Sequence, residues 1–219
     1  MKGQDWVRGV ERLLFPRDIC CAWCGAERGL RPCGLCEDCL NQLPWNDTPA
    51  VREGVICPAP LRYEEQAKRM IHALKFEGRR YLAEPLGRLM AECLRDVEAD
   101  GLIPVPLHPT RYRDRGFNQS ELLCQAISQE LSIPVWHTAL QRVRDTRHQI
   151  GLSAAERREN VKGAFQADAC VAGKTLILVD DVFTTGATFA ACVQELRDKK
   201  AVVRGVAAAR VCEPSADAS

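Results

Sequence analysis

The chain has 219 residues, of which 46% are apolar and 27% are charged, a composition typical of a globular protein with one or two domains. Thirty Lys and Arg against twenty-nine Asp and Glu leave a formal net charge of +1, so the overall charge favours neither a nucleic-acid nor a membrane partner. The sequence has no run of eighteen apolar residues and no signal-peptide pattern, so we expect a cytoplasmic protein without membrane insertion.

The chain begins with a predicted amphipathic helix. Residues 5–15 place Trp6, Val10 and Leu13 on one helical face, and Pro16 ends the pattern. We expect this segment to pack against the main domain as a docking helix.

A cysteine-rich segment follows, and its spacing is typical of a metal site. Two Cys-x2-Cys pairs can each supply two corners of a zinc tetrahedron: Cys21, Cys24, Cys36 and Cys39. Cys20 and Cys33 are rival ligands, since Cys33 also forms a Cys-x2-Cys pair with Cys36. A site closed by four thiolates has no open position for chemistry, so we predict structural Zn²⁺. A redox or disulfide cluster is the alternative, which the expected cytoplasmic location disfavours.

The cysteine-rich segment belongs to a first predicted unit, residues 1–45, which holds the docking helix and the zinc-binding module. Residues 19–43 mix both signs of charge, so we expect this module to contact the main domain or a partner protein rather than DNA. Residues 46–62 are predicted as a linker, with mixed polar residues up to position 53, followed by a first strand that Pro58 and Pro60 interrupt. Residues 63–212 form the main domain, and the polar tail 213–219 is predicted to be disordered.

Helical and strand patterns alternate along the main domain, which predicts a parallel sheet flanked by helices, the α/β class. Helices are expected at residues 67–74, 82–94, 117–127 and 189–196. Strands are expected at residues 102–106, 161–165, 175–179 and 201–209. Prolines in the strand at 102–106 place it at a strand end or at the margin of the sheet.

Basic residues are dense in the predicted loop after the strand at 102–106. Arg111, Arg113 and Arg115 lie close to His108, and guanidinium groups match phosphate oxygens in a bidentate way. Gly116 permits close approach of the backbone, and the helix that follows offers its N-terminus to the same site. The loop therefore predicts an anion site, with a solvated basic loop as the alternative.

The stretch from Thr175 to Thr188 carries the strongest functional pattern. Its first five residues are apolar or β-branched and predict a buried parallel strand, after which Asp180 and Asp181 lie where open α/β sheets bind ligands. A loop rich in threonine then leads into a helix N-terminus, an arrangement suited to a phosphate monoester. The Walker and dinucleotide-binding glycine patterns are both missing from the sequence. An ordinary strand, turn and helix with two solvated acids is the alternative.

The ten residues Val-Asp-Asp-Val-Phe-Thr-Thr-Gly-Ala-Thr from Val179 closely resemble the phosphoribosyl-pyrophosphate signature of type I phosphoribosyltransferases. The resemblance implies that Asp180 and Asp181 hold the ribose hydroxyls of the ligand. It also implies that the loop wraps the 5′-phosphate, and it assigns these residues to ligand binding: Val182, Thr184, Thr185, Gly186, Ala187 and Thr188.

A narrower resemblance covers nearly the whole chain. Ile103-Pro-Val-Pro-Leu-His-Pro-Thr-Arg, Arg115-Gly-Phe-Asn-Gln, Thr146-Arg-x-Gln, Arg157-x-x-Asn-Val and the Asp-Asp motif together resemble the competence protein F (ComF) family. Members are predicted phosphoribosyltransferases with an N-terminal zinc finger, linked to natural transformation and to the use of external DNA. Relatives often carry a further cysteine-rich stretch, whereas here Cys57 stands alone, so we expect one zinc site.

The resemblance implies a type I phosphoribosyltransferase-like domain that binds phosphoribosyl pyrophosphate (PRPP) with Mg²⁺ and transfers phosphoribose to an acceptor. Asp180, Asp181 and Arg115 are the expected catalytic residues, and the pyrophosphate is expected at His108, Arg111 and Asn118. Residues 142–162 would close over the substrate. The acceptor is not identified by the sequence, with a nucleobase as one candidate.

Two alternatives to a phosphoribosyltransferase follow from the same residues. The first is a sensor that binds PRPP without consuming it, because a fold does not settle a function. The second is an accessory protein of DNA uptake, which would bind single-stranded DNA through Arg144 and Arg147 or contact proteins of the uptake machinery.

Overall fold

The computed structural model describes residues 19–144, 156 and 160–212. The predicted docking helix at 5–15, the tail 213–219 and most of the predicted closing segment at 142–162 lie outside the described residues.

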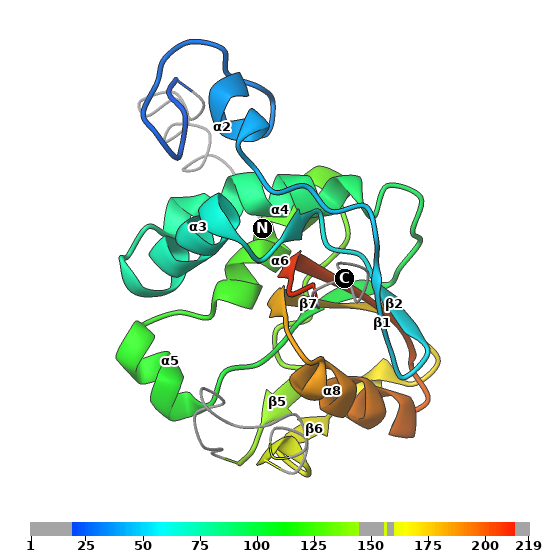
Figure 1. Cartoon of the computed structure of the whole chain (residues 1–219). Helices are drawn as coiled ribbons and strands as arrows, with labels where there is room; N and C mark the ends of the chain where they lie inside the picture. The colour runs from blue at the N-terminus through cyan, green and yellow to red at the C-terminus, as the bar shows by residue number, and fades with distance from the viewer. Residues whose placement is uncertain (1–18, 145–155, 157–159, 213–219) are drawn as a thin grey trace, which may run out of the picture.

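A four-stranded parallel sheet forms the centre of the molecule (Figure 1). Its strands lie in the order β3 (Leu61–Arg62), β8 (Val202–Arg210), β7 (Thr175–Phe183) and β4 (Gly101–Pro104), and each neighbouring pair is parallel. Strand β7 is central, as its uniformly apolar start predicts, and β4 lies at the end of the sheet, as its prolines predict. The predicted α/β class with a parallel sheet is confirmed.

Helices cover both faces of the sheet (Figure 1). On one face α3 (Glu65–Phe76), α4 (Ala83–Glu92) and α6 (Gln119–Leu131) pack onto Ile177 and Val179 of β7. On the other face α8 (Ala187–Asp198) packs onto Leu176 and Leu178. The alternation of side chains along β7 thus divides the interior into two apolar cores.

The cysteine-rich module lies over α3 and α4 and carries the short helix α2 (Glu37–Asn41) (Figure 1). Its residues Leu35 and Leu43 are buried in the same core as the apolar side chains of α3. The module is therefore packed onto the main domain, which was one of its two expected partners.

The stretch predicted as a linker contains an antiparallel hairpin. Strand β1 (Ala50–Arg52) pairs with β2 (Val55–Cys57), and the two residues between them, Glu53 and Gly54, both have positive φ. Positive φ at both positions is typical of the tight turn that matches strand twist. Pro58 and Pro60 then separate β2 from β3, so the predicted interrupted strand is two strands that belong to different sheets.

The basic loop predicted after β4 is mostly helical, which corrects the sequence interpretation. Helix α5 (Pro109–Arg115) has Pro109 at its first turn, the side chain of His108 accepting a hydrogen bond from the Thr110 N–H, and Gly116 in the left-handed conformation at its C-cap. These are ordinary helix-boundary signals. Helix α6 begins at Gln119 because the Asn118 side chain caps it.

A second antiparallel pair lies beside α8. Strand β5 (Leu140–Arg142) pairs with β6 (Phe165–Ala167), and the 3₁₀ turn η2 (Ala169–Val171) leads from β6 into β7. A further 3₁₀ turn, η1 (Arg80–Leu82), connects α3 to α4.

Candidate functional site

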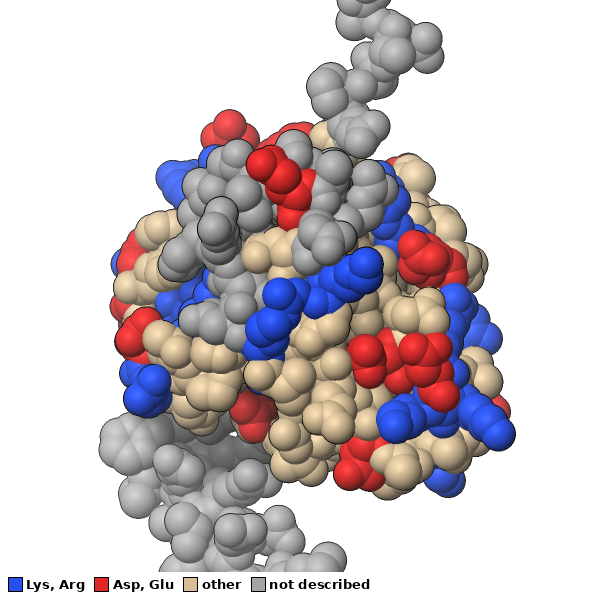
Figure 2. Space-filling model, turned by 90° about the horizontal axis from the view of Figure 1, so that it is seen from below, with Lys and Arg blue, Asp and Glu red and all other residues tan. Residues whose placement is uncertain are grey.

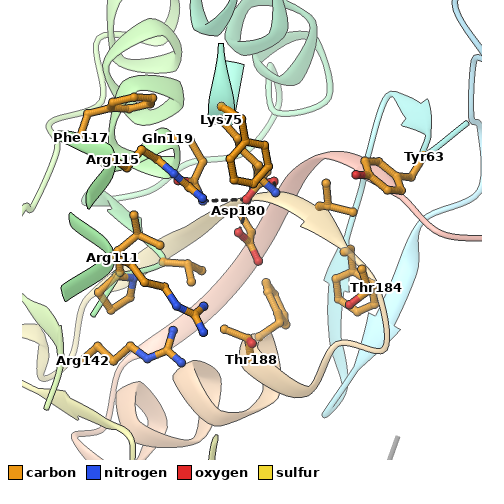
Figure 3. A pocket seen from close by; sticks show the side chains of 18 of the residues that line it. Tyr63, Lys75, Arg111, Arg115, Phe117, Gln119, Arg142, Asp180, Thr184 and Thr188 are labelled. Carbon is orange, nitrogen blue, oxygen red and sulfur yellow. Dashed lines mark hydrogen bonds and ion pairs between the residues drawn. The ribbon is translucent and has the colours of Figure 1, made fainter. Parts of the chain in front are cut away.

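A cavity of about 780 Å³ opens at the carboxyl ends of β4 and β7 (Figure 3). Strand β4 pairs with β7 only as far as Val179, whereas β8 continues to pair with β7 up to Phe183. The chain after β4 therefore leaves the sheet beside Asp180 and opens a crevice where parallel sheets bind ligands. The strand predicted to end at Val179 extends to Phe183, so both acids lie within β7 rather than after it.

Asp181 is held by a buried cation and an amide. Its side chain is 6% exposed, one carboxylate oxygen forms an ion pair with Lys75 Nζ, and the other accepts a hydrogen bond of 3.0 Å from Gln119 Nε2. Burial acts to raise the pKa of Asp181, but the Lys75 ammonium and the Gln119 amide hold it below its usual value. Burial likewise opposes the charge of Lys75, and the carboxylate of Asp181 raises the pKa of that lysine.

Asp180 has a different environment from its neighbour. One carboxylate oxygen accepts a hydrogen bond of 2.8 Å from the Asp181 N–H and one of 3.4 Å from Ser120 Oγ. Burial and then the negative charge of Asp181 raise the pKa of Asp180 to about 8. In the ligand-free protein the acid pair therefore carries one negative charge at neutral pH, and Lys75 balances it.

We expect the raised pKa of Asp180 to make the ligand-free protein less stable as pH rises. The folded pKa of about 8 exceeds the ordinary value of 3.8, so between these values the folded state keeps a proton that the unfolded state has lost. The free energy of unfolding then falls with pH, by up to about 1.4 kcal/mol per pH unit. Thermal unfolding of the wild type and of Asp180→Asn between about pH 6 and 8 checks this. An equal slope in both proteins would contradict the assignment.

The threonine-rich loop and the start of α8 form the floor of the cavity. Thr184, Gly186 and Thr188 line it, and the Oγ1 atom of Thr185 is buried without a hydrogen-bond partner among the described residues. Gly186 caps α8 with a φ of 71°, and a Cβ atom there would lie 2.7 Å from Phe183 Cζ. Glycine is therefore required at this position, and the N-terminus of α8, the end of a helix that suits an anion, opens on the cavity.

Five cationic side chains line the same cavity: Lys75, Arg80, Arg111, Arg115 and Arg142, of which Figure 3 labels all but Arg80. Arg115 donates a hydrogen bond to Gln119 Oε1, and its guanidinium lies 5.0 Å from the centre of the Phe76 ring. Arg142 comes from β5 and is 8% exposed. The cavity thus carries several cations, an arrangement suited to an anionic ligand.

The sequence interpretation did not assign a functional role to Lys75, Arg80, Gln119 or Arg142. Lys75 follows the apolar pattern of α3 immediately, and a lysine at a helix C-terminus is common for reasons of helix dipole alone. Gln119 follows the N-cap of α6 and reaches Asp181 because α6 packs beside β7. These roles depend on contacts between segments that are distant in sequence.

His108 and Asn118 are not brought to the cavity surface. His108 accepts the N-cap hydrogen bond of α5, while Asn118 caps α6 and donates a hydrogen bond of 3.1 Å to the Val105 carbonyl. Both residues position the arginine-bearing segment between them, and Arg111 and Arg115 of that segment reach the cavity.

Four cysteines of the module form a compact cluster: Cys21, Cys24, Cys36 and Cys39, with all four sulfurs within 4.8 Å of one another. The Cys24 and Cys36 sulfurs are 3.6 Å apart, close to the separation of about 3.8 Å that follows from zinc–sulfur bonds of about 2.3 Å in a tetrahedron. Burial alone would raise the pKa of Cys21, but backbone N–H groups of Cys24, Cys36 and Trp23 lower it to about 6. The cluster can hold a zinc ion, and the rivals Cys20 and Cys33 lie outside it.

Charge on the surface is mixed. On the face that carries α8, the described Lys and Arg side chains are interspersed with Asp and Glu (Figure 2). Arg144, expected to contact DNA, donates hydrogen bonds to the carbonyls of Asn160 and Lys162, and Arg147 lies outside the described residues. Among the described helices, none combines the length and apolar character needed to cross a membrane.

Comparisons with solved structures return phosphoribosyltransferases and related enzymes. The allosteric regulatory enzyme of purine biosynthesis matches with 24% identity and a TM-score of 0.38 over 58% of this chain and 26% of that one. Orotate phosphoribosyltransferase of Mycobacterium tuberculosis in complex with PRPP matches with 13% identity and a TM-score of 0.38, over 66% and 87% of the two chains. The α/β fold class rests on the parallel sheet itself.

Sequence relatives give a firmer result, although no family model matches the chain. The chain is 38% identical over 185 residues to DNA utilization protein YhgH of Escherichia coli O157:H7, covering 80% of this chain and 77% of that protein. It is 34% identical over 178 residues to competence protein F of Haemophilus influenzae, covering 77% and 74%. The chain therefore belongs to the family of competence protein F and DNA utilization protein YhgH.

Proposed function

We propose that the chain binds PRPP together with Mg²⁺ in the cavity above β7 and transfers the phosphoribosyl group to an acceptor. We propose further that this reaction contributes to the use of external DNA. The observation that carries the proposal is one cavity that joins an acid pair, the N-terminus of α8 with its threonines, and five cationic side chains. The acid pair suits the ribose hydroxyls of PRPP, the N-terminus of α8 suits the 5′-phosphate, and the cationic side chains suit the pyrophosphate.

The two acids take unequal parts in this proposal. The oxygens of Asp181 are engaged by Lys75 and Gln119, so Asp180 is the acid that accepts hydrogen bonds from the ribose hydroxyls. Asp181 acts by holding Lys75 in the cavity. This assignment changes the symmetrical roles that the family resemblance implies for the pair.

The cationic side chains supply the chemistry of the leaving group. As the bond from the ribose C1 to pyrophosphate breaks, negative charge grows on the pyrophosphate, and Arg111 and Arg115 stabilise it from fixed positions. Thr184, Thr188 and the N–H groups of α8 hold the 5′-phosphate and so fix the sugar. When Mg²⁺ is bound beside it, Asp180 is held in its ionised form and adds negative charge near the sugar, which acquires positive character.

The residues present fit a magnesium ion that is bound mainly by the substrate. Asp180 offers a carboxylate, and Mg²⁺ typically takes one or two protein carboxylates along with substrate oxygens and water. When bound, the ion neutralises charge on the pyrophosphate. In the N-terminal module the four-cysteine cluster holds structural Zn²⁺.

Titration calorimetry with PRPP and Mg²⁺ tests the proposal. Asp180→Asn is expected to weaken binding by about tenfold or more, the effect of losing a charge-assisted hydrogen bond. Asp96→Asn, which changes an exposed acid outside the cavity, is the matched control and should bind as the wild type does. No binding by the wild type would overturn the proposal.

Exchange of labelled pyrophosphate into PRPP separates an enzyme from a sensor. Exchange in the presence of a nucleobase panel supports transfer, because it requires the bond from C1 to break and re-form. Binding without exchange for any base would replace the transferase by a PRPP sensor.

A further inference from the structure

The cysteine module contacts the element that supplies two of the cavity's cations. Helix α3 ends at Phe76, one residue after Lys75, and the turn of residues 77–79 leads into η1, which begins with Arg80. Lys75, Gly78 and Arg80 all line the cavity, whereas no residue of the described module, 19–45, does so. The module can therefore affect the cavity through α3 and this turn.

One contact joins the module to the start of α3. Gln66 is 2% exposed, and its side-chain amide donates a hydrogen bond of 3.1 Å to the carbonyl of Cys39, one of the four clustered cysteines. Buried hydrogen bonds of this kind are directional, and a lost partner leaves a costly unsatisfied group. The backbone of the cysteine cluster thereby fixes the N-terminal end of the helix.

A second contact joins the module to the turn after α3. Trp23 lies between Cys21 and Cys24 in the first Cys-x2-Cys pair, and the guanidinium of Arg79 lies 5.7 Å from the centre of its ring. Such a distance is within the range of a cation–π interaction. Arg79 stands between Gly78 and Arg80, so the module holds the outer side of a turn whose inner side lines the cavity.

The inner side of the turn has contacts of its own. The guanidinium of Arg80 lies 4.5 Å from the centre of the Phe117 ring, beside Gly116 at the end of α5. Lys75 forms its ion pair with Asp181. A shift of the turn would therefore change the positions of both cations relative to the acid pair.

We infer that the cysteine module is a positioning element of the ligand cavity: Trp23 and the Cys39 carbonyl hold α3 and the following turn so that Lys75 and Arg80 face the ligand. The inference rests on the proposed function for its ligand. The metal-bound module then has a second role besides stabilising the fold. It acts on the cavity through its contacts with α3 and the turn and not by touching the ligand.

The test compares Trp23→Ala, Arg79→Ala and the double variant with the wild type. Hydrogen–deuterium exchange is expected to rise in the peptide covering Phe76–Leu82 in all three variants, because the turn loses its outer contact. Affinity for PRPP with Mg²⁺ should fall about two- to fivefold in each, and no further in the double variant than in Arg79→Ala, because that substitution already removes the contact with Trp23 together with the exposed ion pair to Glu77. Trp23→Phe, which keeps an aromatic ring, should restore most of both signals.

Controls separate positioning from unfolding. Each variant should retain one zinc per chain, and Arg69→Ala, which changes an exposed arginine of α3, should leave exchange and affinity unchanged. Unchanged exchange at Phe76–Leu82, or raised exchange with unchanged affinity, overturns the inference. If the wild type itself does not bind PRPP, the proposed function fails, and the exchange arm still decides whether the module orders the turn.

Discussion

Replacing Lys75 with methionine is expected to lower the free energy of unfolding by about 3 kcal/mol. The substitution leaves the carboxylate of Asp181, which is 6% exposed, without its cation, while the Gln119 amide still donates its hydrogen bond. Removing one partner of a buried ion pair is costly because the other charge stays desolvated. Urea denaturation monitored by circular dichroism measures the effect.

A second substitution should reverse most of this loss. In Lys75→Met/Asp181→Asn the buried charge is absent, while the Asn oxygen can still accept the hydrogen bond from Gln119, so stability should recover. The exposed pair of Lys174 and Asp100, 3.5 Å apart, provides a matched control. Lys174→Met should cost less than about 1 kcal/mol, because solvent screens the exposed pair. A double variant as unstable as Lys75→Met would show that the lysine stabilises the fold by packing alone.

The same variants separate stability from ligand binding. The double variant recovers its fold but lacks the cation that faces the cavity. If the chain binds PRPP as proposed, the affinity of this variant for PRPP with Mg²⁺ should therefore stay low. Recovery of wild-type affinity in the double variant would mean that Lys75 has no direct role with the ligand. Calorimetry on the two variants decides this.

Features set by local sequence could be predicted, and the parallel sheet is the best example. The apolar start of β7 predicts a buried strand without any knowledge of the neighbouring strands, because a run of apolar residues of this length is typical of a strand buried on both faces. The prolines of β4 place it at the end of the sheet for an equally local reason, the missing N–H donors. Both expectations are confirmed by the strand order.

Helix α5 was missed although its boundary signals are present in the sequence. Pro109 at the first turn and Gly116 at the C-cap are typical of a short helix, but the dense arginines between them favoured a phosphate-binding loop. Arginine is a good helix former, so the chemistry of a segment and its backbone conformation have to be judged separately.

The unequal environments of the two acids could not be predicted from the motif. Asp180 and Asp181 are adjacent in sequence, yet their side chains point to different surroundings because successive residues of a strand face opposite sides. Lys75 and Gln119 reach Asp181 from α3 and α6, and nothing local to β7 specifies those contacts. The candidate site was therefore predictable in its motif and unpredictable in its electrostatics.

The cysteine cluster was predictable in part. The spacing of the cysteines indicated a site of four thiolates, but it did not decide which cysteines supply them. Cys33 and Cys36 have the same spacing as Cys36 and Cys39, and the fold selects the latter pair by burying Cys39 at α2, against the core of α3. Zinc binding in small modules contributes about 10–16 kcal/mol, which amounts to the folding free energy of the module. The loss of one ligand is thus expected to have the largest effect on stability.

We expect Cys36→Ser to lose zinc and to unfold the module, with a loss of cooperativity in the main domain because Leu35 and Leu43 belong to its core. Cys33→Ser is the matched control, because Cys33 forms a Cys-x2-Cys pair with Cys36 but lies outside the cluster. This variant should keep one zinc per chain and should unfold at the same temperature as the wild type. Zinc content by mass spectrometry, with thermal unfolding of the same samples, measures both outcomes. Zinc loss in Cys33→Ser with retention in Cys36→Ser would reverse the assignment of ligands. Equal retention in both would mean that three thiolates suffice to hold the zinc ion.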